Sequence, residues 1–160
     1  MIPGPILAES LALAGFTHVV WLPDSHLGTW DDAISSHSKL TMVRPCREGE
    51  AVCIAAGLLI GGAKPLVAIQ CTGFFEAGDA VRNVVHDLKL PLKMLVGIRS
   101  WKNRDKSADN CPTYTEPMAR AWNLPVTWFD PFTADAASKV DETIRSLARA
   151  SGPGVLLWGE

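Results

Sequence analysis

The sequence lacks the paired cysteines that a zinc site or a redox dithiol needs. It has four cysteines, and no two of them form a CxxC pair, so neither a structural zinc site nor a thioredoxin-like dithiol is predicted. Cys53 falls inside a predicted helix and Cys71 at the end of a predicted strand, which favours buried free thiols in a reducing compartment. We therefore expect free thiols and no metal bound by this chain.

An excess of positive charge and long apolar runs are also missing. Lys and Arg number 15 against 17 Asp and Glu, a formal net charge of −2, which argues against binding to nucleic acid or to an anionic membrane surface. The apolar stretches are too short and too often broken by Gly, Pro and Lys to cross a membrane. The apolar N-terminal run is interrupted at Glu9 and has no basic leader, so we expect a cytoplasmic protein.

Repeats, low-complexity segments and linkers are absent as well. The 160 residues, of which 48% are hydrophobic, are enough for one domain with a real core, and we predict a single domain over residues 1–160. No glycine-rich phosphate loop follows the first predicted strand, which disfavours an isolated nucleotide-binding domain.

Apolar segments of strand-like and helix-like pattern alternate along the whole chain. Strands are predicted at 18–22, 40–43, 66–70, 92–98, 126–129 and 154–158, and helices at 6–15, 31–36, 48–60, 77–88, 116–122 and 132–147. Continuously apolar strands separated by helices are typical of a parallel sheet covered on both faces. The sequence thus predicts an α/β protein, a three-layer α/β/α domain with a mainly parallel sheet of about six strands.

Ligands of such sheets bind beyond the carboxyl ends of the strands. Segments 23–26, 45–48, 70–73 and the residues from Arg99 onward fall there. In the first segment, Asp24 and Ser25 could contact a substrate or only cap the next turn. His26 could bind a carboxylate or donate a proton at the same edge.

Glu48 begins a predicted helix that is rich in small residues. A carboxylate in the first turn of a helix is common because it complements the helix dipole, for about 0.3–1 kcal/mol. A carboxyl group at the entrance of an apolar pocket is also suited to proton transfer. Glu50 has the stronger claim to being only a helix-start charge.

The order of several segments resembles one enzyme family. Residues 48–57 resemble the pyrimidine-binding half of thiamine-diphosphate enzymes, in which a glutamate opens a helix of small residues that contains an Ala-Gly pair. Residues 22–25 are similar to the loop after the first strand of phosphonopyruvate and sulfopyruvate decarboxylases. Residues 64–73 resemble their following strand and glycine turn, and residues 90–96 their next strand. The likeness runs from about Gly15 to Arg99.

The resemblance implies a thiamine-diphosphate-binding fold, its pyrimidine domain, and a definite chemistry. Glu48 would be the catalytic residue: it would hydrogen-bond a ring nitrogen of thiamine diphosphate and shuttle a proton, which activates the thiazolium carbon for attack on a 2-oxo acid. Carbon dioxide would then leave. The residues placed at the cofactor are Glu48, Gln70, Thr72, Gly73 and Phe74, and those placed at the substrate are Asp24, Ser25 and His26.

The chain departs from this family at the glycine turn. Its relatives tend to carry Asn-Ser-Gly and then Leu-Gly-Asn, whereas Cys71, Thr72 and Gly73 are followed here by two phenylalanines. These rings favour a less hydrophilic or differently shaped substrate, although either could simply pack in the core. The basic residues after the fourth strand could neutralise a phosphonate or sulfonate, or be only a solvated loop; they are Arg99, Lys102, Arg104 and Lys106.

The motifs that hold the cofactor's diphosphate in the family are missing. These enzymes bind Mg²⁺ through a Gly-Asp-Gly turn and a downstream Asn-Asn, and the nearest string here is 78–80, Gly-Asp-Ala. The resemblance therefore implies the α subunit of a two-subunit decarboxylase of sulfopyruvate or phosphonopyruvate type, in a hetero-oligomer whose β subunit binds Mg²⁺. A thiamine-dependent carboligase or lyase subunit, and a non-catalytic α/β binding or regulatory module, remain alternatives.

Overall fold

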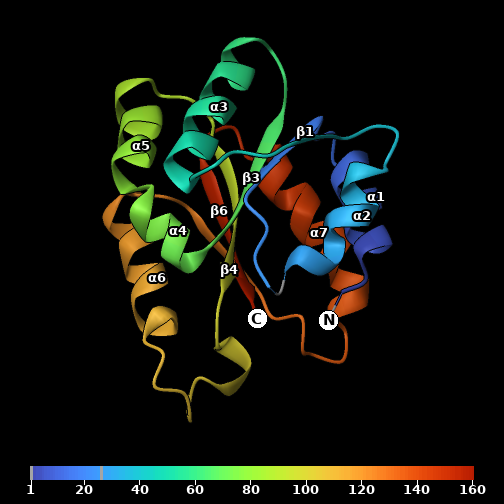
Figure 1. Cartoon of the computed structure of the whole chain (residues 1–160), viewed down its shortest axis with the longest axis vertical. Helices are drawn as coiled ribbons and strands as arrows, with labels where there is room; N and C mark the ends of the chain where they lie inside the picture. Colours follow the sequence, from blue (N-terminus) through green and yellow to red (C-terminus); the bar gives the residue numbers. More distant parts are fainter. Residues whose placement is uncertain (1, 26) are drawn as a thin grey trace.

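The computed structural model describes residues 2–25 and 27–160. Its centre is a sheet of six strands in the order β2-β1-β3-β4-β6-β5, all parallel (Figure 1). The prediction of a parallel sheet is confirmed. The strands are β1 (His18–Trp21), β2 (Thr41–Val43), β3 (Pro65–Gln70), β4 (Lys93–Ile98), β5 (Val126–Phe129) and β6 (Gly154–Gly159).

Helices cover both faces of this sheet and complete the three predicted layers. In Figure 1, α3, α4, α5 and α6 lie on one side of the strands, and α1, α2 and α7 lie on the other. The α-helices are α1 (Gly4–Leu13), α2 (Asp31–Ser35), α3 (Glu48–Ile60), α4 (Cys71–Glu76), α5 (Gly78–Arg82), α6 (Cys111–Ala121) and α7 (Ala136–Arg149). Shorter turns are the 3₁₀ segments η1 (Leu27–Trp30) and η3 (Trp101–Asn103) and the π-helical segment η2 (Asn83–Asp87).

Each central strand contributes side chains to two hydrophobic cores, one on each face of the sheet, because successive side chains of a strand point to opposite faces. In β4, Met94 and Val96 pack beneath α3 to α6, while Leu95 packs beneath α1 and α7. All six residues of β4 are buried, as are the six of β6. A strand covered on both sides has no polar face, which explains why these segments read as continuous apolar runs.

The helix that carries Glu48 ends on a glycine. Gly62 has φ +83°, the left-handed region where a side chain is strained. This conformation lets the Ala63 N–H reach back to the Leu58 carbonyl at 2.9 Å and closes the helix. The chain then enters β3 at Pro65.

Three helices begin earlier than predicted, α1 at Gly4 instead of residue 6 and two others by more. The segment after β3 was predicted to turn on Gly73 and to start a helix near residue 77, but α4 begins at Cys71, immediately after the strand. The helix expected from residue 116 begins at Cys111. Pro112 occupies its first turn, where proline costs no hydrogen bond because that N–H would have no partner within the helix.

Candidate functional site

The order of the strands reverses at the carboxyl edge between β1 and β3. The chain leaves β1 toward β2 on one side, and it leaves β3 toward β4 on the other side. Open α/β sheets bind ligands where the order reverses in this way. The segments that meet there are residues 22–25 after β1, residues 44–47 before α3, and residues 70–73 after β3.

The first turn of α3 is capped by two glutamates other than Glu48. Glu50 Oε2 accepts the Cys46 N–H at 2.7 Å, and Glu76 Oε2 accepts the Gly49 N–H at 3.0 Å. Glu76 also pairs with Arg47 at 3.0 Å. These contacts satisfy free N–H groups at the helix start. The capping role therefore belongs to Glu50 and Glu76.

Glu48 lies against Gly73 and keeps its polar atoms unpaired. Its side chain is half-buried, and a Cβ atom on Gly73 would lie 2.2 Å from Glu48 Cγ and 2.3 Å from its Oε1. Within residues 2–25 and 27–160, no hydrogen bond or ion pair engages the Glu48 carboxylate. The glycine is required for this close approach rather than for a turn, and the carboxylate is left available to a ligand.

Gln70 and Thr72 form a polar path away from this contact. The Thr72 hydroxyl donates to Gln70 Oε1 at 3.3 Å, and Gln70 Nε2 donates to Glu160 Oε2, also at 3.3 Å. Thr72 is exposed, whereas Glu160 is only 8% exposed. Glu160 follows β6 at the same edge of the sheet. It joins the candidate site through Gln70.

Glu160 was missed by the sequence reasoning although a signal for it existed. It is a polar residue directly after an apolar strand, the same pattern that singled out Asp24. Burial and the negative charge of Asp24 raise the pKa of Glu160 to about 7, against the opposing effects of Gln70 and Arg99. The site thus contains a carboxyl group that titrates near neutral pH.

We expect the Glu160→Gln variant to be more stable than the parent chain at pH 8, by about 1–3 kcal/mol. Glu160 binds its proton more tightly in the folded chain than at the ordinary value of 4.5. Its contribution to stability is therefore full below pH 4.5 and is lost as the pH rises toward about 7. Urea denaturation of both proteins at the two ends of this range measures the difference.

A surface glutamate serves as the matched control for this experiment. Glu142 is largely exposed and pairs with Arg149, so Glu142→Gln should change the free energy of unfolding by less than about 1 kcal/mol at either pH. A stability difference between Glu160→Gln and the parent that does not depend on pH would contradict a raised pKa of Glu160.

The other predicted site residues differ in burial and in what they contact. Asp24 is half-buried at the mouth between β1 and β3, near enough to Glu160 to affect its charge, and Ser25 is exposed beside it. His26 lies outside the described residues. Phe74 is fully buried and packs against Trp122 with 5.2 Å between ring centroids. Its side chain thus belongs to the core, whereas Gly73 beside it contacts Glu48.

The charged loop after β4 is largely paired within itself. Arg99 forms an ion pair with Asp109 at 2.7 Å, which raises the pKa of the arginine and holds that of Asp109 well below its usual range. Arg104 lies over the ring of Trp101 at 4.0 Å. Trp101 in turn rests on Gly159, where a Cβ would lie 2.3 Å from the ring. Arg99 and Arg104 are therefore engaged in holding the loop against β6.

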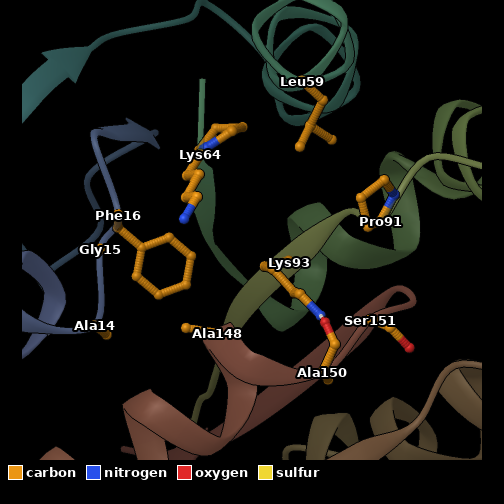
Figure 2. Close-up of a pocket in the computed structure, with 11 residues that line it drawn as sticks. Ala14, Gly15, Phe16, Leu59, Lys64, Pro91, Lys93, Ala148, Ala150 and Ser151 are labelled. Atoms are coloured by element: carbon orange, nitrogen blue, oxygen red, sulfur yellow. Dashed lines mark hydrogen bonds between the residues drawn. The ribbon is translucent and has the colours of Figure 1, made fainter. Parts of the chain in front are cut away.

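A cavity of about 190 Å³ opens at the opposite, amino edge of the sheet (Figure 2). Lys64 extends into it beside Phe16, and Lys93 extends toward Ala150, as Figure 2 shows. Lys93 is only 6% exposed and donates to the carbonyls of Ala150, at 2.7 Å, and Gly152. Burial lowers the pKa of this lysine. Its ammonium group fixes the turn between α7 and β6, so this cavity is separate from the candidate site.

No helix within residues 2–25 and 27–160 has both the length and the apolar character needed to cross a membrane.

Cys71 is buried as predicted, but Cys53 is exposed, which corrects the expectation of a buried thiol. Cys53 lies on the outer side of α3, next to a groove that faces α5 rather than the sheet.

Solved structures of thiamine-diphosphate enzymes resemble this chain over nearly its whole length. They include a Rhodococcus jostii RHA1 thiamine diphosphate-dependent 4-hydroxybenzoylformate decarboxylase (TM-score 0.69, 22% identity) and a putative thiamin diphosphate-dependent enzyme from Mycobacterium smegmatis (0.72, 20%). A third is benzoylformate decarboxylase from Polynucleobacter necessarius (0.72, 20%). The chain has the fold of part of these enzymes.

The likeness covers 99% of this chain but only 30% of each of those chains. No protein-family model and no curated protein matches the sequence. The predicted three-layer α/β fold is thus confirmed, and it matches part of the fold of these enzymes. Whether this chain shares the activity of the matched enzymes depends on the residues of its candidate site.

Proposed function

We propose that the chain is the pyrimidine-binding part of a thiamine-diphosphate-dependent decarboxylase that acts on a 2-oxo acid. The observation that carries this proposal is the Glu48 carboxylate, which lies against Gly73 at the carboxyl edge with no polar partner among the described residues. Two other glutamates cap its helix, so helix capping does not account for Glu48. The residues present fit thiamine diphosphate.

Glu48 would act on the cofactor through its carboxyl group. When bound, thiamine diphosphate supplies a nucleophilic carbon and an electron sink for the loss of carbon dioxide. Glu48 would hold and exchange a proton with a ring nitrogen, and a fixed position makes such exchange efficient. Gly73 permits that position because it has no Cβ, and the exposed Thr72 hydroxyl next to it offers a further hydrogen bond.

Segments that could contact a substrate lie at the same edge of the sheet as Glu48. Asp24 and Ser25 follow β1 at this edge, and loop 99–110 follows β4. Because Arg99 pairs with Asp109, and Arg104 stacks on Trp101, less cationic charge faces a substrate than the sequence indicates. The two similar enzymes with substrate names are decarboxylases of benzoylformate type. We keep sulfopyruvate and phosphonopyruvate as candidate substrates beside such aromatic 2-oxo acids.

A partner chain is part of the proposal. The sequence covers only 30% of each of the similar enzymes, and its 160 residues include no Gly-Asp-Gly or Asn-Asn motif for the diphosphate and Mg²⁺. In the nearest string, Asp79 is already engaged by Arg82 and Asn83. An apolar groove of about 460 Å³ runs between α3 and α5–η2, and Ile60 and Leu88 at its edge are 71% and 55% exposed. Such a surface supports contact with another chain.

Co-expression with the proposed partner chain tests the proposed function. The partner would be the product of a neighbouring gene that carries Gly-Asp-Gly and Asn-Asn, and the assay would follow carbon dioxide release from a panel of 2-oxo acids. The panel should include sulfopyruvate, phosphonopyruvate and benzoylformate. Release that needs both chains, thiamine diphosphate and Mg²⁺ is the expected result.

The alternatives give different outcomes in the same experiment. A carboligase or another lyase would consume the 2-oxo acid and form a new carbon–carbon bond or a different cleavage product, which product analysis identifies. A folded, monomeric chain that neither binds thiamine diphosphate with a partner nor turns over any substrate would favour a non-catalytic binding or regulatory module.

A further inference from the structure

Three side chains link the interior of the sheet edge to its surface. Glu160 is 8% exposed, its Oε2 accepts the Gln70 amide N–H at 3.3 Å, and Gln70 Oε1 accepts the Thr72 hydroxyl at 3.3 Å. Thr72 is exposed beside Gly73, on which Glu48 lies. A change at the buried carboxyl can therefore be transmitted to the surface of the candidate site.

The second oxygen of Glu160 restricts how this carboxyl can carry a proton. Glu160 Oε1 is buried and has no hydrogen-bond partner among residues 2–25 and 27–160. A proton on Oε1 would be buried without an acceptor, which is costly. A proton on Oε2 would face the Gln70 Nε2 group, which is itself a donor. Protonation thus brings two donors together unless Gln70 reorients.

Gln70 can resolve this conflict by turning its amide over. The two ends of an amide group have nearly the same shape, so the turned group fits the same space. Its carbonyl then accepts from protonated Glu160, and its NH₂ group faces Thr72. The Thr72 hydroxyl becomes the acceptor in that contact, and its own proton is free to point out of the site.

We propose that Glu160 is a positioning residue that, through Gln70, determines whether Thr72 presents a hydrogen-bond acceptor or a donor at the candidate site. With Glu160 ionised, the Thr72 proton is held by Gln70, and its lone pairs face outward. With Glu160 protonated, the hydroxyl can donate outward. What this does for a bound cofactor or substrate rests on the proposed function, whereas the change in Gln70 and Thr72 does not.

Within the described part of the chain, two charged groups face Glu160 from neighbouring segments. Asp24, after β1, raises the pKa of Glu160 together with burial, and Arg99, after β4, lowers it. Arg99 is itself paired with Asp109 at 2.7 Å, which limits its effect on Glu160. The resulting pKa of about 7 means that both forms of Glu160 are populated near neutral pH.

Nuclear magnetic resonance of the full chain tests this role without any ligand. Gln70 is the single glutamine of the sequence, so a glutamine side-chain label reports on it alone. We expect the Gln70 amide signals and the Glu160 carboxyl carbon to shift with one common midpoint near pH 7. Nuclear Overhauser contacts from the Gln70 NH₂ protons to the Thr72 methyl group should be strong at about pH 5.5 and weak at about pH 8.

Glu160→Met is the variant for this test because it is neutral, similar in length and adds no second glutamine. The transition of the Gln70 signals should disappear in it and persist in the Glu142→Met control on α7. Contacts between Gln70 and Thr72 that stay constant while Glu160 titrates would overturn the proposal. So would a Glu160 midpoint near the ordinary 4.5. Neither outcome depends on whether thiamine diphosphate binds.

Discussion

The Glu48→Gln variant is expected to fold and assemble like the parent chain but to lose about 10²–10⁴-fold of its turnover. Glutamine has the shape of glutamate and can still form a hydrogen bond, but it cannot exchange the proton that the proposed chemistry needs. Folding should be little affected because the Glu48 carboxylate has no partner among the described residues. Steady-state turnover of the co-expressed complex and urea denaturation of the variant measure the two effects separately.

Glu50→Gln on the same turn of α3 is the matched control. Glu50 accepts the Cys46 N–H, so its replacement should cost about 0.5–1.5 kcal/mol of stability and leave turnover nearly unchanged. If Glu48→Gln kept full turnover, or if both variants lost the same fraction of it, Glu48 would not be the catalytic residue.

The Gly73→Ala variant should show how much turnover depends on the position of the Glu48 carboxyl group, because it leaves that group chemically unchanged. Its methyl group would overlap the end of the Glu48 side chain, with 2.2 Å to Cγ and 2.5 Å to Cδ. Because that side chain is flexible, the carboxyl group would move aside, and α4 would gain about 0.5–1 kcal/mol from the better helix former. A displacement of this size is expected to reduce turnover about 10²-fold while stability stays level or rises.

Gly152→Ala provides the comparison for that variant. Gly152 lies between α7 and β6 at the opposite edge of the sheet, and no atom is within 4 Å of the position its Cβ would take. The variant should gain similar stability, because alanine restricts the unfolded chain, and should keep full turnover. In the Glu48→Gln background, Gly73→Ala should add little further loss, because both changes act on one group. Unimpaired turnover in Gly73→Ala alone would show that the contact between Gly73 and Glu48 has no catalytic role.

The strands, and with them the edge of the sheet at which their carboxyl ends lie, could be predicted from the sequence, because burial on both faces leaves a clear apolar pattern. β4 and β6 are examples, with every residue buried. The start of α4 could not, since Cys71, Thr72 and Gly73 have the composition of a turn, and the helix there is stabilised by packing. Local propensity is a weak guide where tertiary contacts decide.

The candidate site was predicted in part for similar reasons. Glu48 and Gly73, which the resemblance places at the cofactor, lie in contact, and their roles there stay predictions. Glu160 was overlooked although it follows an apolar strand, and its burial depends on the loop held over β6 by Trp101, which no local pattern reveals. Phe74, predicted at the cofactor, is buried against Trp122, because a phenylalanine beside a glycine has the same sequence signature whether it faces a ligand or the core.

The outermost strands of the sheet determine how this chain can meet other chains. β2 has three residues and β5 has four, so each leaves few backbone N–H and C=O groups for another strand to join. Pro125 precedes β5, and Arg44, held by Asp31, follows β2. Proline and charge at a sheet margin discourage strand addition and amyloid-like growth. Any stable association must therefore be made by helices and loops rather than by extending the sheet.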